Sequence, residues 1–338
     1  MDNSAYRNEL DRIRYTAEGR AALAEQLMRA QSAERGRRSV RWPRKMMAVA
    51  IAAAVLVGTA AAAAGPLWER YFGHLDEGQQ AVIDSLSATP ETLPAAESNG
   101  TVMTPLAAFG DRDFYYLMLE IRAPEGTVLP DYGEEKGYYQ LFGDAPGEKI
   151  SLMDGDGQEL YNNREFAWMP RTGEDNVLTA VLRLWPAEGV DFSDGTDKIL
   201  HIPGLWVQSP DKVYTPVLTG SWDFNIGAHS GGVESRTPDV AGVTVESEDC
   251  GTMTLEYLRI SPLGMRIRYS WSDPVEGVWP SAELAVVMKG GSEVSLANSV
   301  GSAGEDWSEA YGPFDTPVNI EQAAAVRWGD AIIPLEAD

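Results

Sequence analysis

A stretch of nineteen uncharged residues, 46–64, constrains this chain more than any other feature of its sequence. Ten of the nineteen are alanine, and Gly58 and Thr59 are only mild interruptions of an otherwise apolar segment. As an α-helix the stretch would rise about 28 Å, which approaches the roughly 30 Å hydrocarbon thickness of a bilayer. The sequence therefore predicts a single transmembrane helix over residues 46–64.

Basic residues gather on one side of this predicted span. Six of the eleven residues 35–45 are Arg or Lys, whereas Arg70 alone follows the span closely and stands among acidic residues. This asymmetry predicts that residues 1–45 are cytoplasmic and residues 66–338 extracytoplasmic. Residues 35–65 would form a basic juxtamembrane stretch and the span, in contact with the lipid bilayer. The predicted membrane-interface residues are Arg41, Trp42, Arg44, Lys45 and Trp68.

A cleaved signal peptide is the main alternative for the same segment. Residues 62–64 are three alanines, which suit a signal peptidase and would leave a mature chain that begins at Gly65. The forty-five residues before the span are far longer than an ordinary charged leader, which favours the anchor.

The charge of the chain is divided unevenly. Residues 1–45 hold 11 basic and 6 acidic residues, or +5, which leaves 27 − 11 = 16 basic and 51 − 6 = 45 acidic residues, or −29. A body this acidic is not expected to bind nucleic acid. The single cysteine, Cys250, excludes an intrachain disulfide, so the outer body must be stable through burial alone.

Residues 1–34 read as a short amphipathic helical hairpin, because large apolar residues recur there at helical spacing. Two helices of this length bury little surface, so the hairpin is either a weak leader or a docking element completed by a cytoplasmic partner. No His or Cys occurs in residues 1–45, which excludes a zinc site there. The predicted partner-binding residues are Tyr6, Leu10, Ile13, Leu23, Leu27 and Met28.

A helix is predicted at 75–86 and a linker at 87–100. The sequence that follows consists of short runs typical of β-strands, separated by Gly, Pro, Asp and Asn. A first series of strands is predicted at 101–107, 114–121, 137–141, 149–153, 177–185, 198–205, 212–218 and 222–226. A second series is predicted at 243–246, 253–260, 264–270, 282–287, 293–296 and 324–334. The fold class is therefore mainly β, with two β-sandwich-like domains at 66–230 and 231–338. One elongated β domain remains the alternative.

Motifs that carry chemistry are scarce. The acidic run from Asp154 to Glu165 has Glu159 where a calcium loop needs glycine, so a tight turn is expected instead. Ser209 and Lys212 match a Ser-x-x-Lys pattern but follow a strand rather than opening a helix. We therefore expect no enzyme, no catalytic residues, no cofactor and no metal.

Several stretches resemble the bacterial membrane proteins of the DUF4179 type: TVMTPLAAFGDRDFYYLMLEIRAPEGTVL (101–129), GSWDFNI (220–226), LRISPLGMRIRY (258–269) and VRWGDAIIPL (326–335). The resemblance covers most of the chain and rests on framework residues of a β region. It implies an anti-sigma factor for an extracytoplasmic-function sigma factor. Because the usual His and Cys-x-x-Cys module is absent, that role would be of the zinc-free type.

The leading hypothesis is thus a membrane regulator that holds a sigma factor through residues 1–34 and senses an envelope signal outside. Release by an intramembrane or site-1-type protease would fit the weakened helix at Gly58 and Thr59. The alternative is a membrane-tethered binding or adhesion protein with no regulatory role. A secreted hydrolase without recognisable motifs is a third, weaker hypothesis, because the chain has only three histidines.

Overall fold

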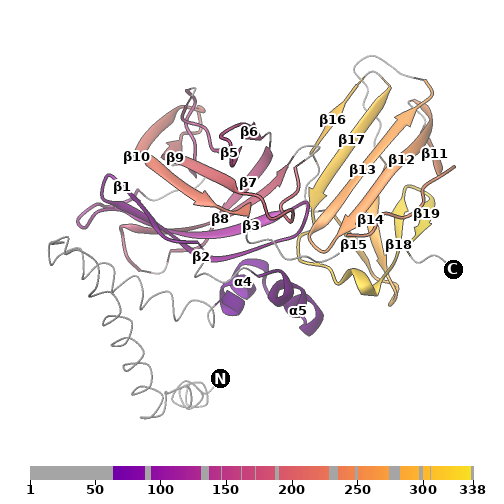
Figure 1. Ribbon diagram of the computed structural model, residues 1–338, viewed down its shortest axis with the longest axis horizontal. Coiled ribbons are helices and arrows are strands. Elements are labelled where there is room, and N and C mark those ends of the chain that lie inside the picture. The colour runs from indigo at the N-terminus through magenta and orange to yellow at the C-terminus, as the bar shows by residue number, and fades with distance from the viewer. Residues whose placement is uncertain are drawn as a thin grey trace, which may run out of the picture. The chain divides into compact units, whose positions relative to one another are not determined.

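The chain folds mainly as antiparallel β-sheet (Figure 1). The computed structural model describes residues 64–87, 93–130, 137–145, 147–160, 162–171, 173–186, 190–227, 235–247, 250–273, 282–296, 300–304 and 306–335. All of them belong to one unit with bounds Ala53–Asp338. The predicted cytoplasmic residues and the predicted span, except Ala64, lie outside the described residues. Within the described ranges, no helix has both the length and the apolar character needed to cross a bilayer.

Two sheets are formed by the first half of the described chain. The first has the order β1 (Ala96–Ser98), β2 (Thr101–Gly110), β3 (Tyr115–Arg122), β8 (Val177–Pro186) and β7 (Asn162–Trp168). The second has the order β10 (Tyr214–Asn225), β9 (Lys198–Gln208), β5 (Ser151–Asp154) and β6 (Glu159–Leu160), and β4 (Tyr138–Gln140) also pairs with β9. Both sheets contribute side chains to one hydrophobic core.

Two further sheets are formed by the second half. The third sheet has the order β11 (Thr244–Ser247), β12 (Gly251–Ser261), β13 (Gly264–Trp271), β17 (Trp307–Pro313) and β16 (Val300–Ala303). The fourth has the order β15 (Glu293–Ser295), β14 (Leu284–Met288), β18 (Ala323–Trp328) and β19 (Ala331–Pro334). A second core joins them, with Tyr269 and Trp328 in ring contact at 5.5 Å between centroids.

Strand β3 of the first sheet has buried residues on both faces. Alternate residues of β3, such as Leu117, Leu119 and Ile121, belong to the core shared with the second sheet. Tyr116 and Met118 point to the other face and belong to a third core. Over residues 115–119 the alternation therefore separates two apolar faces, whereas Glu120 and Arg122 at the end of the strand are only partly buried.

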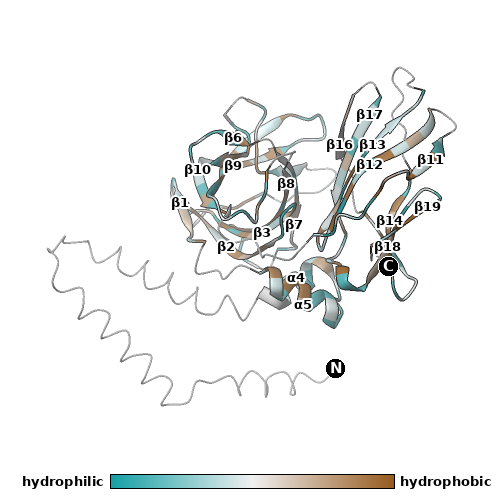
Figure 2. Cartoon of the chain, turned by 45° about the vertical axis from the view of Figure 1, so that its right-hand side comes forward, coloured by the Kyte–Doolittle hydropathy of each residue, from teal (hydrophilic) through white to brown (hydrophobic). Residues whose placement is uncertain are grey.

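Two helices cover that other face. α4 (Ala64–Phe72) contacts β2, and α5 (Glu77–Leu86) begins at a capping box in which Asp76 and Gln79 exchange side chain and backbone hydrogen bonds. Both helices carry hydrophobic residues beside polar ones (Figure 2). With residues of β2, β3, β8 and the third sheet they form what we call the junction core. Its largest members are Trp68, Phe109, Phe114, Tyr116, Trp185, Leu263 and Tyr311.

Trp68 lies at the centre of the junction core and is fully buried. Its ring meets Phe109 edge to face at 4.5 Å between centroids and also contacts Tyr116. Its Nε1 has no hydrogen-bond acceptor among the described residues, so apolar packing alone holds it. The prediction that Trp68 lies at a membrane interface is therefore wrong for this structure, because the side chain has no surface to offer to lipid.

The predicted strands are largely confirmed, with instructive differences. The predicted strands 212–218 and 222–226 form the single strand β10, because bulges after Pro216 and Thr219 accommodate the proline and Gly220 without ending the pairing. The predicted strand 324–334 is a hairpin, β18 and β19, which turns at Gly329 with φ +56°. The helix predicted at 75–86 is confirmed as α5. None of the predicted elements corresponds to α4, β1, β6, β7, β16 or β17.

The coarse prediction of a mainly β fold is confirmed by these four sheets of the described chain. The proposed division at 230/231 falls among residues 228–234, outside the described residues. The domain boundaries therefore stay a prediction.

Truncation of Trp68 tests how much the junction core contributes to the free energy of unfolding. We expect Trp68→Ala to lower the free energy of unfolding by about 3–5 kcal/mol, because it leaves a large apolar cavity. Urea unfolding of the full chain in detergent measures the loss. Tyr138→Ala, which truncates a ring that is 47% exposed, should cost far less. Equal losses in the two variants would contradict the buried position of Trp68.

Candidate functional site at the junction of the sheets

A tight turn joins β2 to β3 and carries the sequence Asp111-Arg-Asp-Phe114. The Asp111 carboxylate Oδ1 accepts hydrogen bonds from the backbone N–H groups of Asp113 at 2.8 Å and Phe114 at 2.9 Å. The backbone N–H of Asp111 donates to the carbonyl of Phe114 at 2.9 Å. Aspartate stabilises turns in this way, so the sequence itself sets the local shape.

The same two aspartates reach the third sheet. Asp111 Oδ2 accepts from the backbone N–H of Leu263, in the turn between β12 and β13, at 3.2 Å. Asp113 forms a two-pronged ion pair with Arg259 of β12, in which Nε donates to Oδ2 at 2.7 Å and Nη2 donates to Oδ1. Each partner of this pair keeps 10% of its side chain exposed. We call these contacts the polar junction.

Close packing accompanies the polar junction. A Cβ atom on Gly264 would overlap the Phe114 ring and the carbonyl oxygen of Gly312. Only glycine therefore fits at the start of β13, where the β2–β3 turn meets the third sheet. On the helical side, Gln79 Nε2 donates to Thr316 Oγ1 at 3.0 Å, so α5 also contacts the second half of the chain.

Burial changes the acid–base behaviour of Asp111. Its side chain has no solvent exposure, and this desolvation, with the neighbouring Asp113 charge, raises the pKa of Asp111 from 3.8 to about 7. The backbone hydrogen bonds oppose this rise because they favour the ionised carboxylate. Asp111 is therefore a buried acid that titrates near neutral pH.

A cavity of about 440 Å³ opens beside the polar junction, and we call it the arginine cavity. It is lined by Arg112, Val190, Asp191, Tyr257, Arg259, Arg266, Arg268 and Glu309. Arg112 and Asp191 belong to the first half of the chain, and the residues of β12, β13 and β17 belong to the second. The cavity is thus bounded by both halves.

Each arginine of the cavity has a carboxylate partner. Arg112 Nε lies 3.2 Å from Asp191, and Arg268 Nε lies 3.1 Å from Glu256. Arg266 pairs with Glu309, while Arg259 takes part in the polar junction. The Arg268 guanidinium also lies over the Trp307 ring, 4.6 Å from its centroid.

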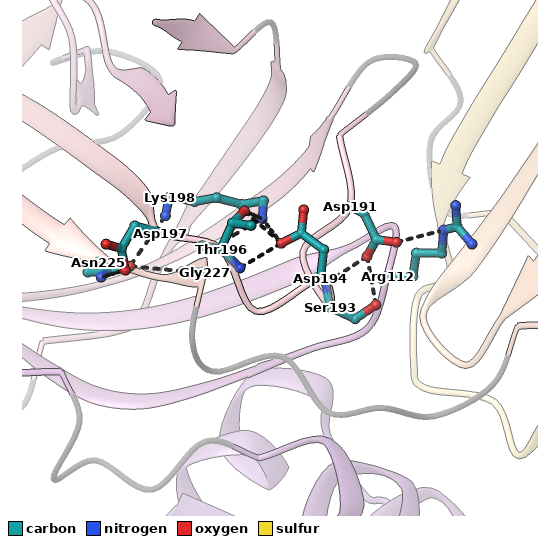
Figure 3. A network of polar contacts seen from close by, with 9 residues as sticks. All are labelled: Arg112, Asp191, Ser193, Asp194, Thr196, Asp197, Lys198, Asn225 and Gly227. Atoms are coloured by element: carbon teal, nitrogen blue, oxygen red, sulfur yellow. Dashed lines mark hydrogen bonds and ion pairs between the residues drawn. The ribbon is translucent and has the colours of Figure 1, made fainter. Parts of the chain in front are cut away.

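Asp191, which lines the arginine cavity, is held in place by hydrogen bonds within its own loop, as Figure 3 shows. Asp191 Oδ1 accepts from the backbone N–H of Ser193 at 2.7 Å and from its hydroxyl at 2.6 Å. Further along, Asp194 accepts from Thr196 at 2.8 and 2.7 Å and pairs with the buried Lys198. These short-range contacts fix Asp191 opposite Arg112.

The functional residues predicted from the sequence do not lie in the polar junction or the arginine cavity. The predicted partner-binding residues and the interface residues at 41–45 lie outside the described residues. The acidic run at Asp154 forms a tight turn, where Oδ1 accepts from the N–H groups of Asp156 and Gln158. No cluster of metal-ligating side chains occurs in the part of the chain that the structure describes. Cys250 is buried.

Sequence reasoning missed both the polar junction and the arginine cavity. One signal was present: Arg266 and Arg268 alternate along a strand, which puts both on one face. The pairing of Asp113 with Arg259, 146 residues apart, had no local signal.

No family model matches this chain, and no curated protein matches it. A solved structure that it is similar to is the crystal structure of the conserved domain protein from Bacillus anthracis. The two chains are 16% identical, with 70% of this chain and 76% of that chain covered at a TM-score of 0.45. This likeness is too distant to carry an argument.

Titration of Asp111 predicts a specific pH dependence. The folded chain keeps the proton up to about pH 7, whereas an unfolded chain releases it near pH ~4. As the pH rises between these values, the wild type should therefore become less stable relative to Asp111→Asn. The unfolding equilibrium constant of the wild type should increase by up to about tenfold per pH unit relative to that of the variant. Above pH ~7 the difference should be constant. Urea midpoints across pH 4–9 measure it, with Asp211→Asn as the control for the loss of one exposed charge. A pH-independent difference for Asp111→Asn would contradict the assignment.

Removing one partner of the buried ion pair should be costly. Asp113→Asn leaves the Arg259 guanidinium without its counter-charge in a site of low exposure, and we expect a loss of about 3–5 kcal/mol. Glu174→Gln, which removes a partner of Arg122 that is 62% exposed, should cost no more than about 1 kcal/mol. Similar unfolding midpoints for the two variants would refute the importance of the polar junction.

Proposed function

We propose that this chain is a single-pass membrane regulator of the anti-sigma type. Residues 46–64 would cross the membrane, residues 1–34 would hold an extracytoplasmic-function sigma factor, and residues 66–338 would form two β-sandwich-like domains outside. The resemblance to DUF4179-type proteins and the absence of zinc ligands in residues 1–45 favour a zinc-free member of this class.

One structural observation carries the proposal furthest. Ala64, the last residue of the predicted span, is the first residue of α4, and Trp68 lies one turn further along the same helix. Trp68 is buried against β2 and β3, and the junction core around it includes Leu263 and Tyr311 of the second half. A change at this junction would therefore act directly on the helix that follows the span, as a sensor of an envelope signal requires.

Charge gives independent support. Six of the eleven residues 35–45 are Arg or Lys, whereas Arg70 alone follows the span closely, and this asymmetry agrees with the topology that the proposal needs. On the cytoplasmic side, Tyr6, Leu10, Ile13, Leu23, Leu27 and Met28 would supply the contact surface. Full burial of such side chains is worth roughly 1.5–3 kcal/mol each, enough for a stable complex after the cost of ordering the hairpin.

Capture of a sigma factor by the tagged full chain tests the proposal. Crosslinking in intact cells followed by purification should recover one sigma factor, and deletion of residues 2–34 should raise transcription of its target genes. Leu23→Asp should abolish the capture, because it puts a charge into the apolar stripe. The matched control Gln26→Asp, three residues away, should retain it. Failure to recover a sigma factor, together with unchanged transcription on deletion, would reject the function.

A membrane-tethered binding protein is the second candidate, and the arginine cavity is the observation that favours it. In that case residues 2–34 would be dispensable for every activity of the chain. Processing by an intramembrane or site-1-type protease belongs only to the regulatory proposal, where it would release the sigma factor.

A further inference from the structure

We propose that the arginine cavity binds one small organic carboxylate that also carries hydroxyl or ammonium groups, such as a sugar acid or a short peptide. This inference rests on the proposed function only for the idea that the ligand is a signal. Binding itself depends on the cavity alone.

Guanidinium groups are concentrated at this cavity. Residues 66–338 contain 45 acidic and only 16 basic residues, eleven of which are arginine, yet four of those arginines line this one cavity. In a body this acidic, such a cluster is not a consequence of composition. Guanidinium groups bind carboxylates through two parallel hydrogen bonds, which gives geometric specificity as well as attraction.

Two of these arginines have hydrogen-bonding capacity to offer. Arg112 and Arg268 each use Nε for a carboxylate partner, and their Nη groups donate to no other described residue. Their side chains are 48% and 38% exposed, so a ligand can reach them. Contact with the Trp307 ring restricts the plane of the Arg268 guanidinium, which reduces the entropy lost on binding.

The carboxylates of the cavity narrow the class of ligand. Asp191 and Glu309 line the same space as the arginines, so a doubly charged phosphate would be repelled from part of it. A ligand with one carboxylate can accept hydrogen bonds from the Nη groups of Arg112 and Arg268, and its hydroxyl or ammonium groups can donate to Asp191 or Glu309. The volume of about 440 Å³ lies in the range of roughly 300–1,000 Å³ that is typical of small-molecule sites.

The position of the cavity gives the ligand a role. Arg112 follows Asp111 and precedes Asp113, the two residues of the polar junction, while Arg268 lies on β13 of the third sheet. A carboxylate held by both arginines would bridge the two halves beside the junction core. Binding would thus stabilise one arrangement of the junction. The size of this effect is set by the difference in the ligand's affinity for that arrangement and for the alternative.

Isothermal titration of the full chain in nonionic detergent tests the site. D-glucuronate and alanylalanine are the two carboxylate probes, and they distinguish a sugar acid from a peptide. We expect at least one of them to bind at one site per chain. Arg112→Gln and Arg268→Gln should each weaken binding at least about tenfold. D-glucuronamide and alanylalanine amide, in which a neutral amide replaces the carboxylate, should not bind.

Matched variants separate the site from a general charge effect. Arg122→Gln and Arg327→Gln each remove one partly exposed, ion-paired arginine outside the cavity and should bind as the wild type does. Thermal unfolding of each variant verifies that it is folded. The inference is overturned if neither probe binds, if a neutral amide or inorganic phosphate binds as tightly, or if the control variants weaken binding equally. Sigma-factor capture by the same wild-type preparation reports separately on the proposed function.

Discussion

The ion pair between Asp113 and Arg259 is the interaction on which the junction of this protein depends. Both side chains are nearly excluded from water, and each would be a costly unpaired charge without the other. Asp111, two residues earlier, adds a hydrogen bond to the backbone of Leu263. One short turn thus supplies all these contacts with the third sheet. Arg112 stands between the two aspartates, so its backbone position, and with it one wall of the arginine cavity, is set by the same turn.

The apolar part of the junction follows from the same strands. Phe114 packs against Gly264, and Tyr116 and Phe109 stack at 4.7 Å between centroids beneath Trp68. Polar and apolar contacts therefore share β2 and β3, and a shift of one entails a shift of the other. Because α4 belongs to this core, the segment that follows the predicted span is joined to sheets from both halves of the chain. This continuity is the physical basis of the proposed regulation.

How much the sequence predicts can be judged from particular elements. Strands with clear alternation, such as β3 and β13, were predicted nearly at their observed bounds, and the helix predicted at 75–86 corresponds to α5. Local rules failed where long-range packing decides the outcome. In β10, bulges carry the pairing past Pro216 and Gly220. Trp68 was assigned to a lipid interface because it follows an apolar span, although β2 and β3 bury it. The ion pair of Asp113 with Arg259 joins distant residues, and no local pattern encodes it.

Amide hydrogen exchange of α4 in the full chain tests the central claim, that the helix after the predicted span is coupled to the polar junction. The account predicts slow exchange for the α4 amides in the wild type. In Asp113→Asn these amides should exchange faster, by a factor similar to that for the amide of Leu263. Exchange of α4 at the rate of an unstructured peptide in the wild type, or α4 protection unchanged by Asp113→Asn, would contradict it.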